Sequence, residues 1–238
     1  MKIAATGQPG QQLEIASKTL PRETEWIWVD SIPALAQQEN VDLYIDLTFS
    51  MQEERIRELG GLPGPVLINS VTHTVAEICA AAPAPQSQSG SSPRRHPSPH
   101  QHPLCRFART NGWPGFLTGN LWELAAADET TGACVRDLLT AAGQSCRMVP
   151  DIPGMIGARI LCSLINEAYY TLQDQVSTRE EIDTAMKLGT NYPLGPFEWG
   201  SKIGLPAIYE LLQTLSRTNR RYTPAQALEL ESARLKSD

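Results

Sequence analysis

The first chemistry that the sequence suggests lies in a short glycine-containing turn near the amino terminus. Residues 2–6 are predicted to form a strand, and the run Thr-Gly-Gln-Pro-Gly carries Gly7 and Gly10 directly after it. Glycines at such a turn let the backbone approach a pyrophosphate, as in the Gly-x-Gly-x-x-Gly turn of dinucleotide-binding folds. Only two glycines fall near the right place, and Pro9 removes a backbone donor. A plain loop and a phosphate cradle therefore both stay open.

A carboxylate follows the second predicted strand, where a dinucleotide-binding fold places its ribose partner. Asp30 comes directly after the β-rich run at residues 25–29. It lies about 20 residues past Gly10, the spacing at which an acidic residue accepts hydrogen bonds from ribose hydroxyls. An Asp after a strand is also an ordinary helix N-cap, and the sequence leaves the two interpretations even.

The segments that must position these groups alternate between strand and helix patterns. Strands are predicted at residues 2–6, 25–29, 41–47, 65–69, 107–110, 121–124 and 145–149. Helices are predicted between them at residues 51–59, 74–81 and 129–142, the last with Gly143 as its C-cap. Near-continuous apolar runs in the strands favour a parallel sheet covered on both faces.

After residue 150 the pattern is helical. Residues 155–172 carry one broad apolar face, which is typical of a central buried helix. Ser177 and Glu180 have the spacing of a capping box, and the helix that they open is expected to end at Gly189.

Two more segments complete this half. The run at residues 192–196 predicts a rigid proline turn, and residues 207–215 predict a further helix. Thr223 as N-cap and Pro224 at the first helical position predict the last helix. The expected fold is α/β: a shortened Rossmann-like parallel sheet domain at residues 1–150, followed by an all-α domain at residues 151–238.

Composition and charge exclude several classes of protein. Of 238 residues, 41% are hydrophobic and 19% charged, which is typical of a folded chain. The net charge of −6 argues against a nucleic-acid partner. No apolar run approaches the roughly 18 residues that span a bilayer, and the start lacks a secretory signal, so we expect a cytoplasmic protein without a membrane partner. Five cysteines without a Cys-x-x-Cys pair predict reduced thiols and no zinc site.

Residues 82–104 differ from the rest in being dense in Pro, Ser, Gln and His. Such a tract cannot offset the entropy of ordering its backbone, so a disordered insert is predicted. Three histidines in it are close enough in sequence to bind a metal weakly, but a polar tract that contains His by chance is the favoured interpretation (His96, His100, His102). The insert could also capture a protein partner, although a tolerated insertion is favoured.

Motifs in the carboxyl-terminal part resemble the C-terminal domain of 3-hydroxyacyl-CoA dehydrogenases. They are Asp-Ile-Pro-Gly-Met-Ile-Gly-Ala-Arg-Ile at 151–160, Asn-Glu-Ala at 166–168, Glu-Ile-Asp-Thr-Ala-Met-Lys-Leu-Gly at 181–189, Pro-Leu-Gly-Pro-Phe-Glu at 193–198 and Ile-Gly-Leu at 203–205. Residues 42–46 and 66–72 resemble the family more loosely. The resemblance lapses over residues 1–25 and over the insert.

This resemblance implies a two-domain oxidoreductase in which a Rossmann domain holds NAD. The helical domain of the family forms the dimer contact and helps to seat an acyl-CoA. Hydride passes between C3 of a 3-hydroxyacyl-CoA and the nicotinamide, a His takes the hydroxyl proton, and a Glu orients that His. For this chain the resemblance implies NAD, an acyl-CoA-type ligand and a homodimer formed through the helical domain.

The catalytic residues of the family carry over only in part. The family Glu lands on Glu123, but the His lands on Asn111, which cannot act as a general base at neutral pH. The family Asn lands on Ala158, which has no polar group. The family Ser lands on Ser70 or, with a one-residue shift, on Thr72.

Two further positions complete the predicted site. A cofactor-contacting Lys of the family lands on Arg55, which keeps the charge, and the Glu before it lands on Ser50. His73 is considered as a replacement base with Glu123 as its partner, although a surface or helix-start His is the favoured interpretation. The predicted catalytic positions are Glu123, Ser70, Asn111 and His73, and the predicted cofactor positions are Gly7, Gly10, Asp30 and Arg55.

Two classes of function follow. One is a 3-hydroxyacyl-CoA dehydrogenase-like oxidoreductase, with NAD-linked hydride transfer at a 3-hydroxyacyl-CoA or a related hydroxy acid. The other is a catalytically inactive relative that binds a CoA ester or a nucleotide, or that serves as a dimeric interaction protein. Loss of the general base would cost about 10²–10⁴-fold in rate.

Overall fold

The computed structural model describes residues 1–82 and 106–235, which form two compact units. The first unit comprises Met1–Gly112 and Phe116–Asp151, and the second comprises Trp113–Gly115 and Ile152–Asp238. Apart from Ala82, the insert predicted at residues 82–104 lies outside the described residues, and so do its three histidines. Within the described ranges, none of the helices has the length and apolar character needed to cross a bilayer.

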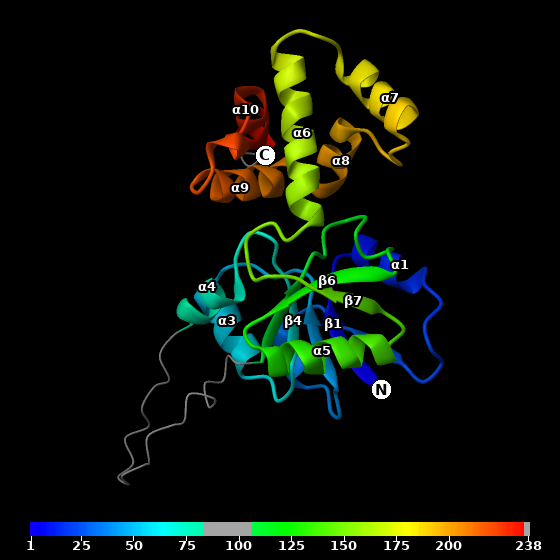
Figure 1. Cartoon of the computed structure of the whole chain (residues 1–238). Helices are drawn as coiled ribbons and strands as arrows, with labels where there is room; N and C mark the ends of the chain where they lie inside the picture. Colours follow the sequence, from blue (N-terminus) through cyan, green and yellow to red (C-terminus); the bar gives the residue numbers. More distant parts are fainter. Residues whose placement is uncertain (83–105, 236–238) are drawn as a thin grey trace. The chain divides into compact units, whose positions relative to one another are not determined.

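The first unit is built on a seven-stranded sheet with the order β2-β1-β3-β4-β5-β6-β7 (Figure 1). Its strands are β1 (Lys2–Thr6), β2 (Glu25–Trp28), β3 (Leu43–Asp46), β4 (Val66–Asn69), β5 (Phe107–Thr110), β6 (Leu121–Ala126) and β7 (Ser145–Met148). The first five strands pair in parallel, β6 is antiparallel to β5, and β7 is parallel to β6. The predicted α/β class with a Rossmann-like, mostly parallel sheet is confirmed.

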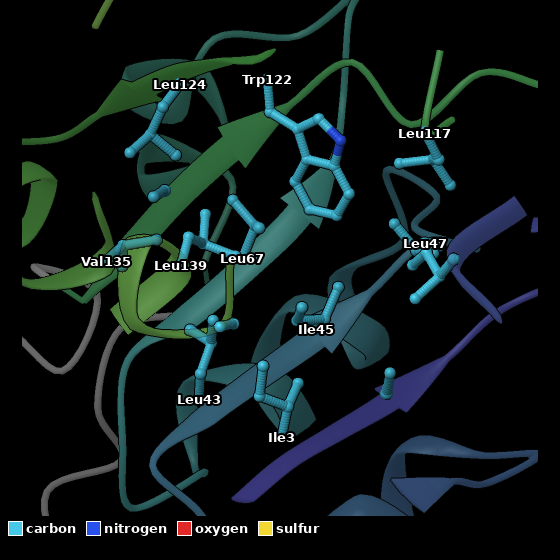
Figure 2. Close-up of a cluster of buried hydrophobic side chains, with 14 residues drawn as sticks. Ile3, Leu43, Ile45, Leu47, Leu67, Leu117, Trp122, Leu124, Val135 and Leu139 are labelled. Carbon is cyan, nitrogen blue, oxygen red and sulfur yellow. The ribbon is translucent and has the colours of Figure 1, made fainter. Parts of the chain in front are cut away.

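Helices cover both faces of this sheet, because the buried side chains of each strand alternate between the two faces. The helices are α1 (Pro9–Ala16), α2 (Ile32–Ala36), α3 (Glu53–Gly60), α4 (Val75–Ala80) and α5 (Glu129–Ala141). On one face, strand residues such as Leu43 and Leu67 pack with Val135 and Leu139 of α5 (Figure 2). On the other face, strand residues pack with α2, α3 and α4 (Ala4, Tyr44, Val66, Ile68, Ile32, Leu35, Ile56, Leu59, Val75, Ile78).

The turn expected at the end of β1 is in large part a helix. Glycine and proline are the strongest turn signals in a sequence, which is why residues 9–16 carry no helix prediction. In the structure Pro9 occupies the first position of α1, where its missing N–H costs nothing. The short α2 begins with Ile32 and Pro33 and is also absent from the sequence prediction.

The second unit has the long helix α6 (Gly157–Gln173) at its centre. Figure 1 shows α7 (Arg179–Thr190) and α8 (Pro196–Ile203) on one side of α6, with α9 (Leu205–Ser216) and α10 (Gln226–Leu235) on the other. Leu161, Ile165 and Tyr169 of α6 are buried. The all-α character predicted for this part of the chain is confirmed.

Several predicted helix ends in this unit are wrong. The capping box of α7 uses Thr178 and Glu181, one residue later than predicted, and α7 continues past Gly189 to Thr190. Asn191 then ends it in the left-handed region, with a φ of 57°. Helix α8 is absent from the sequence prediction because its first residue, Pro196, is also a turn signal.

The last helix also begins later than predicted, at Gln226 and not after Thr223. The physical reason is a pair of hydrogen bonds from α6. The Asn166 side chain donates from Nδ2 to the carbonyl oxygen of Thr223 (2.8 Å), and its Oδ1 accepts from the backbone N–H of Ala225 (2.8 Å). Because these bonds tie the backbone of Thr223 and Ala225 to the Asn166 side chain, the helix begins only after them.

Candidate functional site

Most of the predicted site residues lie along the edge of the sheet that is formed by the carboxyl ends of its parallel strands. Gly7 follows β1, Ser70 follows β4, and Asn111 follows β5. Because β6 runs antiparallel to β5, its first residues lie at this same edge, and Glu123 is among them. Ligands of open α/β sheets bind outside the carboxyl ends of the strands, so this edge is the candidate site.

The strand register sets Asn111 opposite Glu123. Strands β5 and β6 pair Ala108 with Ala126, Arg109 with Ala125 and Thr110 with Leu124, so the next pair outward joins positions 111 and 123. Side chains directly opposite each other on antiparallel strands share a face, with Cβ atoms about 4.5–5.5 Å apart.

Hydrogen bonding supports this pairing at the end of β5. Thr110 donates from Oγ1 to the backbone carbonyl of Glu123 at 2.8 Å. Asn111 is 4% exposed and Glu123 is half-buried. The register thus sets a carboxamide and a carboxylate at neighbouring strand positions, one able to donate an N–H and the other able to accept a proton, although the buried Nδ2 of Asn111 does not donate to Glu123.

Ser70 and His73 lie in the turn between β4 and α4. Ser70 donates from Oγ to the carbonyl oxygen of His73 (2.8 Å), which closes the turn. His73 is half-buried and directly precedes Thr74, the N-cap of α4. Strand β4 lies two strand positions from β6, roughly 10 Å across the sheet. The backbone position of His73 is thus that of a helix-start residue.

A buried ion pair lies beside this turn and is absent from the sequence prediction. Arg109 of β5 is fully buried, and its Nε donates to Oδ1 of Asp151 at 2.6 Å. Its Nη1 donates to the carbonyl oxygen of Ser70 at 2.9 Å. The Asp151 carboxylate also accepts from the first two backbone N–H groups of α4, Val75 (3.1 Å) and Ala76 (3.3 Å). An Arg inside a predicted central strand was the available signal, since a buried guanidinium needs a carboxylate partner.

The predicted cofactor residues lie at the other end of the edge. Asp30 is exposed after β2, and its interpretation as a helix N-cap is wrong, because Ser31 caps α2 by accepting from the Ala34 N–H at 3.3 Å. A Cβ added at Gly10 would meet no atom within 4 Å, so the start of α1 is open. A Cβ at Gly7 would lie 2.8 Å from the Trp28 ring, so this ring requires a glycine there.

These residues fit the adenosine end of a dinucleotide. The exposed Asp30 carboxylate can accept hydrogen bonds from ribose hydroxyl groups, and the open backbone at Gly10 leaves room for a phosphate. Pro9 offers no N–H, and the Gln8 N–H already donates to Oε1 of Gln11 at 2.9 Å. The turn therefore presents fewer donors than a complete Gly-x-Gly-x-x-Gly turn.

Arg55 lies in a charged network at the end of β3. It makes a two-pronged contact with the fully buried Asp46, from Nε to Oδ2 (2.8 Å) and from Nη2 to Oδ1 (2.6 Å). Thr6 and Thr48 also donate to Asp46 Oδ1, at 2.8 and 3.0 Å. The charge of Arg55 thus neutralises a buried carboxylate that the sequence prediction did not identify as a partner.

The motifs that carry the resemblance in the second unit hold helices together. The Asp183 carboxylate accepts from the backbone N–H groups of Phe197 (2.8 Å) and Glu198 (3.2 Å) and so caps α8. A Cβ at Gly195 would lie 2.3 Å from Asp183, which explains the glycine. Ala158 is fully buried in α6 and brings no polar group to any site.

Comparison with known proteins identifies relatives of this chain. Residues 154–233 match the sequence pattern of the family described as 3-hydroxyacyl-CoA dehydrogenase, C-terminal domain. The chain is 36% identical over 117 residues to 3-hydroxyadipyl-CoA dehydrogenase of Escherichia coli (strain K12), which is 47% of this chain and 25% of that protein. It is 30% identical over 142 residues to a probable 3-hydroxybutyryl-CoA dehydrogenase of Deinococcus radiodurans, which is 53% of this chain and 51% of that protein.

A solved structure shares the fold over almost the whole chain. The (S)-3-hydroxybutyryl-CoA dehydrogenase of Ralstonia eutropha aligns with a TM-score of 0.66 and 19% identity, covering 98% of this chain and 93% of that one. The sequence matches to the two curated relatives above span between a quarter and about half of their length. Residues 154–233 therefore carry the sequence pattern of the 3-hydroxyacyl-CoA dehydrogenase C-terminal domain, and the chain as a whole shares the fold of this solved structure.

Proposed function

We propose that this protein is an NAD-linked oxidoreductase of a 3-hydroxyacyl-CoA or a related hydroxy acid. The observation that carries the proposal is the register of β5 and β6, which sets position 111 opposite position 123 at the carboxyl edge of the sheet. In this proposal the sheet domain, residues 1–150, binds the nucleotide, and the helical domain, residues 151–238, helps to seat the acyl-CoA.

Within this site Asn111 and Glu123 together take the roles that the His and the Glu have in the family. The Asn111 carboxamide donates an N–H to the oxygen on C3 and orients it, and the Glu123 carboxylate accepts the hydroxyl proton as that carbon becomes a carbonyl. Ser70 helps to position the substrate, and His73 contributes through the turn that it shares with Ser70. Because a carboxylate is a weaker base than imidazole, we expect turnover about 10²–10⁴-fold below that of an enzyme with a His base.

The cofactor would lie along the same edge, on the side of β1 and β2. Asp30 would accept hydrogen bonds from the ribose hydroxyl groups, and the backbone at Gly7 and Gly10 would face the pyrophosphate. Arg55, held by its ion pair with Asp46, would lie close to the cofactor at the end of β3. Bound NAD would supply the hydride acceptor. The exposed carboxylate of Asp30 and the open space at Gly10 support this assignment.

The decisive experiment restores the missing base. The variant Asn111→His places an imidazole opposite Glu123, and we expect it to raise kcat for acetoacetyl-CoA reduction by about 10²-fold or more. NADH absorbance at 340 nm follows the reaction. Asn120→His is the matched control, because residue 120 is exposed in the connection before β6 and lies outside the strand pairing.

The outcome separates the two classes of function. Slow turnover by the wild type, an increase only in Asn111→His and loss on Glu123→Gln would support the proposal. Absence of NADH binding and of turnover in the wild type and in Asn111→His would refute it.

A second candidate is a relative that binds a CoA ester without hydride transfer. It is favoured by Asn111 and the buried Ala158, which stand where the family has a general base and a polar side chain. Calorimetry with acetoacetyl-CoA tests it: binding without any turnover, even in Asn111→His, is the expected result.

We also propose that the helical domain pairs with a second copy of this chain. Ile156 and Ile160 lie one turn apart at the start of α6 and are 51% and 59% exposed. Adjacent exposed isoleucines are typical of a surface that a partner covers. Light scattering should give a dimer for the wild type and a monomer for Ile156→Glu with Ile160→Glu; a monomeric wild type would contradict this proposal.

A further inference from the structure

We propose that Gln11 and Asn69 are positioning residues, whose carboxamides clamp the backbone N–H and carbonyl of Gly112 and so fix the neighbouring side chain at position 111 toward Glu123. This inference rests on the proposed function, because it assigns Asn111 and Glu123 to the site.

The first half of the clamp comes from α1. Gln11 is 4% exposed, and its Nε2 donates to the carbonyl oxygens of Gly112 (2.8 Å) and Leu47 (3.2 Å). Its Oε1 accepts from the backbone N–H of Gln8 at 2.9 Å. One side chain thus bonds the start of α1 to the residues that follow β3 and β5.

The second half of the clamp comes from β4. Asn69 accepts at Oδ1 from the backbone N–H of Gly112 (2.9 Å) and donates from Nδ2 to the carbonyl oxygen of Leu47 (3.1 Å). Both backbone groups of Gly112 are therefore bonded to side-chain amides, one from each neighbouring element. The carboxamides of Gln11 and Asn69 both also bond to the carbonyl oxygen of Leu47, and they hold Gly112 from two directions.

The packing around Gly112 leaves no room for a side chain within this clamp. A Cβ at that position would lie 2.9 Å from Asn69 Cγ and 3.1 Å from Leu47 Cδ2. Only a glycine allows the two amides to close on the backbone at this distance. Since residue 111 is the next residue along the chain, a fixed peptide at Gly112 also fixes the direction of the side chain at 111.

The clamp should affect the rate of the reaction more than the affinity for the substrate, because it fixes the position of a reacting group. A displacement of a reacting group by about 1 Å can cost about 10²-fold in rate. Asn111 lies beyond the last paired residue of β5, so strand pairing alone holds it less firmly than it holds Thr110. The clamp therefore supplies the rigidity that strand pairing does not.

The test uses an imidazole at position 111 as a reporter that needs no turnover. In Asn111→His, burial lowers the pKa of the imidazole, and the neighbouring Glu123 carboxylate should raise this pKa by about one unit against that effect. Proton NMR of the C2 proton measures this pKa. Adding Glu123→Gln should abolish the rise and so identify its source.

The clamp is then removed in the same background. Adding Gln11→Leu, which keeps a similar volume but cannot donate, should remove most of the rise in the imidazole pKa that Glu123 causes and lower kcat by about 10- to 100-fold. Gln12→Leu is the matched control. Gln12 lies next along α1 and donates to the carbonyl oxygen of Gly7 at 2.9 Å, away from β5, so its loss should leave the pKa unchanged.

The outcomes are distinct from those of the proposed function. An unchanged pKa in Gln11→Leu, or equal changes in Gln11→Leu and Gln12→Leu, would overturn the clamp even if the enzyme is active. A selective change supports the clamp even if no turnover is seen.

Hydrogen exchange in the otherwise wild-type chain gives a second measurement that does not need the His variant. Asn69→Leu, which removes the acceptor of the Gly112 N–H, should speed exchange of that N–H by about fivefold, the effect of one lost hydrogen bond, whereas Gln12→Leu should not. Equal exchange rates in all three proteins would also overturn the proposal.

Discussion

The guanidinium of Arg109, fully buried on β5, is paired with the carboxylate of Asp151, the last residue of the first unit, at an Nε–Oδ1 distance of 2.6 Å. The same carboxylate accepts the first N–H groups of α4. One side chain thus joins the middle of the sheet, a helix start and the point at which the chain leaves the sheet.

We expect Asp151→Asn to lower the free energy of unfolding by about 3–5 kcal/mol, because the change leaves a buried guanidinium without its countercharge. Urea denaturation followed by tryptophan fluorescence measures the change. Glu53→Gln is the control, since it breaks the Arg57–Glu53 pair, whose side chains are 58% and 63% exposed. Exposed pairs contribute less than about 1 kcal/mol. Equal effects of the two substitutions would contradict a structural role for the buried pair.

Two glycines in the second unit should respond oppositely to alanine. Gly195→Ala places a Cβ 2.3 Å from Asp183, so we expect a loss of about 1–3 kcal/mol from overpacking and about 1 kcal/mol more if the cap on α8 opens. Gly189 lies within α7 with no atom within 4 Å of an added Cβ. Gly189→Ala should therefore stabilise the protein by about 0.5–1 kcal/mol. Thermal unfolding of both variants checks the signs, and a stabilised Gly195→Ala would refute the steric argument.

Lys18 should make stability depend on pH. Burial lowers the pKa of its ammonium from 10.5 to about 8, while the nearby Glu14 carboxylate and Cys146 oppose this shift. Its Nζ donates to the carbonyl oxygen of Gly119 (2.7 Å) and to Gln144 Oε1, and lies over the Trp122 ring.

Between pH 8 and 10.5 the unfolded chain holds a proton on Lys18 that the folded chain has released, so this group makes the free energy of unfolding rise with pH. Below pH 8 the cost of burying the charge is present in full. In Lys18→Met this contribution should vanish. The difference between wild type and variant in urea denaturation from pH 7 to pH 10.5 isolates Lys18, and a pH-independent difference would rule out the assignment.

The described cysteines should differ strongly in reactivity. Cys134 is exposed, whereas Cys162 is buried, and burial raises the pKa of the Cys162 thiol well above its usual value. Burial also raises the pKa of Cys146 to about 11, against the opposing charges of Arg136 and Lys18. At pH 8 iodoacetamide should modify Cys134 first, and Cys162 only after denaturation. Peptide mass spectrometry resolves the sites; early labelling of Cys162 would contradict its burial.

The strands could be predicted well, because consecutive apolar residues bounded by turn signals leave few alternatives. The reversal of β6 could not, since the direction of a strand leaves no local signature. It is this reversal that brings Glu123 to the edge where the parallel strands end. The resemblance alone pointed to Glu123 and Asn111, and the register of β5 and β6 sets the two positions on neighbouring strands.

Helix starts at prolines were missed for a different reason. Pro9 and Pro196 both stand at the first position of a helix, and a proline there gives the same local signal as a proline in a turn. The partners of Arg109 and Gln11 were out of reach as well. Each contact joins residues far apart in the chain, Arg109 with Asp151 and Gln11 with Gly112, and a single sequence carries no record of such pairs.

Neighbouring strands set the base of the segment between Asn111 and Glu123, so its two ends stay adjacent when residues are added at its exposed positions. Lengthening a loop costs little, about 0.6 kcal/mol for each doubling. Within this segment Trp113 and Leu117 are buried, whereas residues 118–120 are exposed, so these exposed residues are the part that evolution or an engineer can lengthen while positions 111 and 123 keep their register.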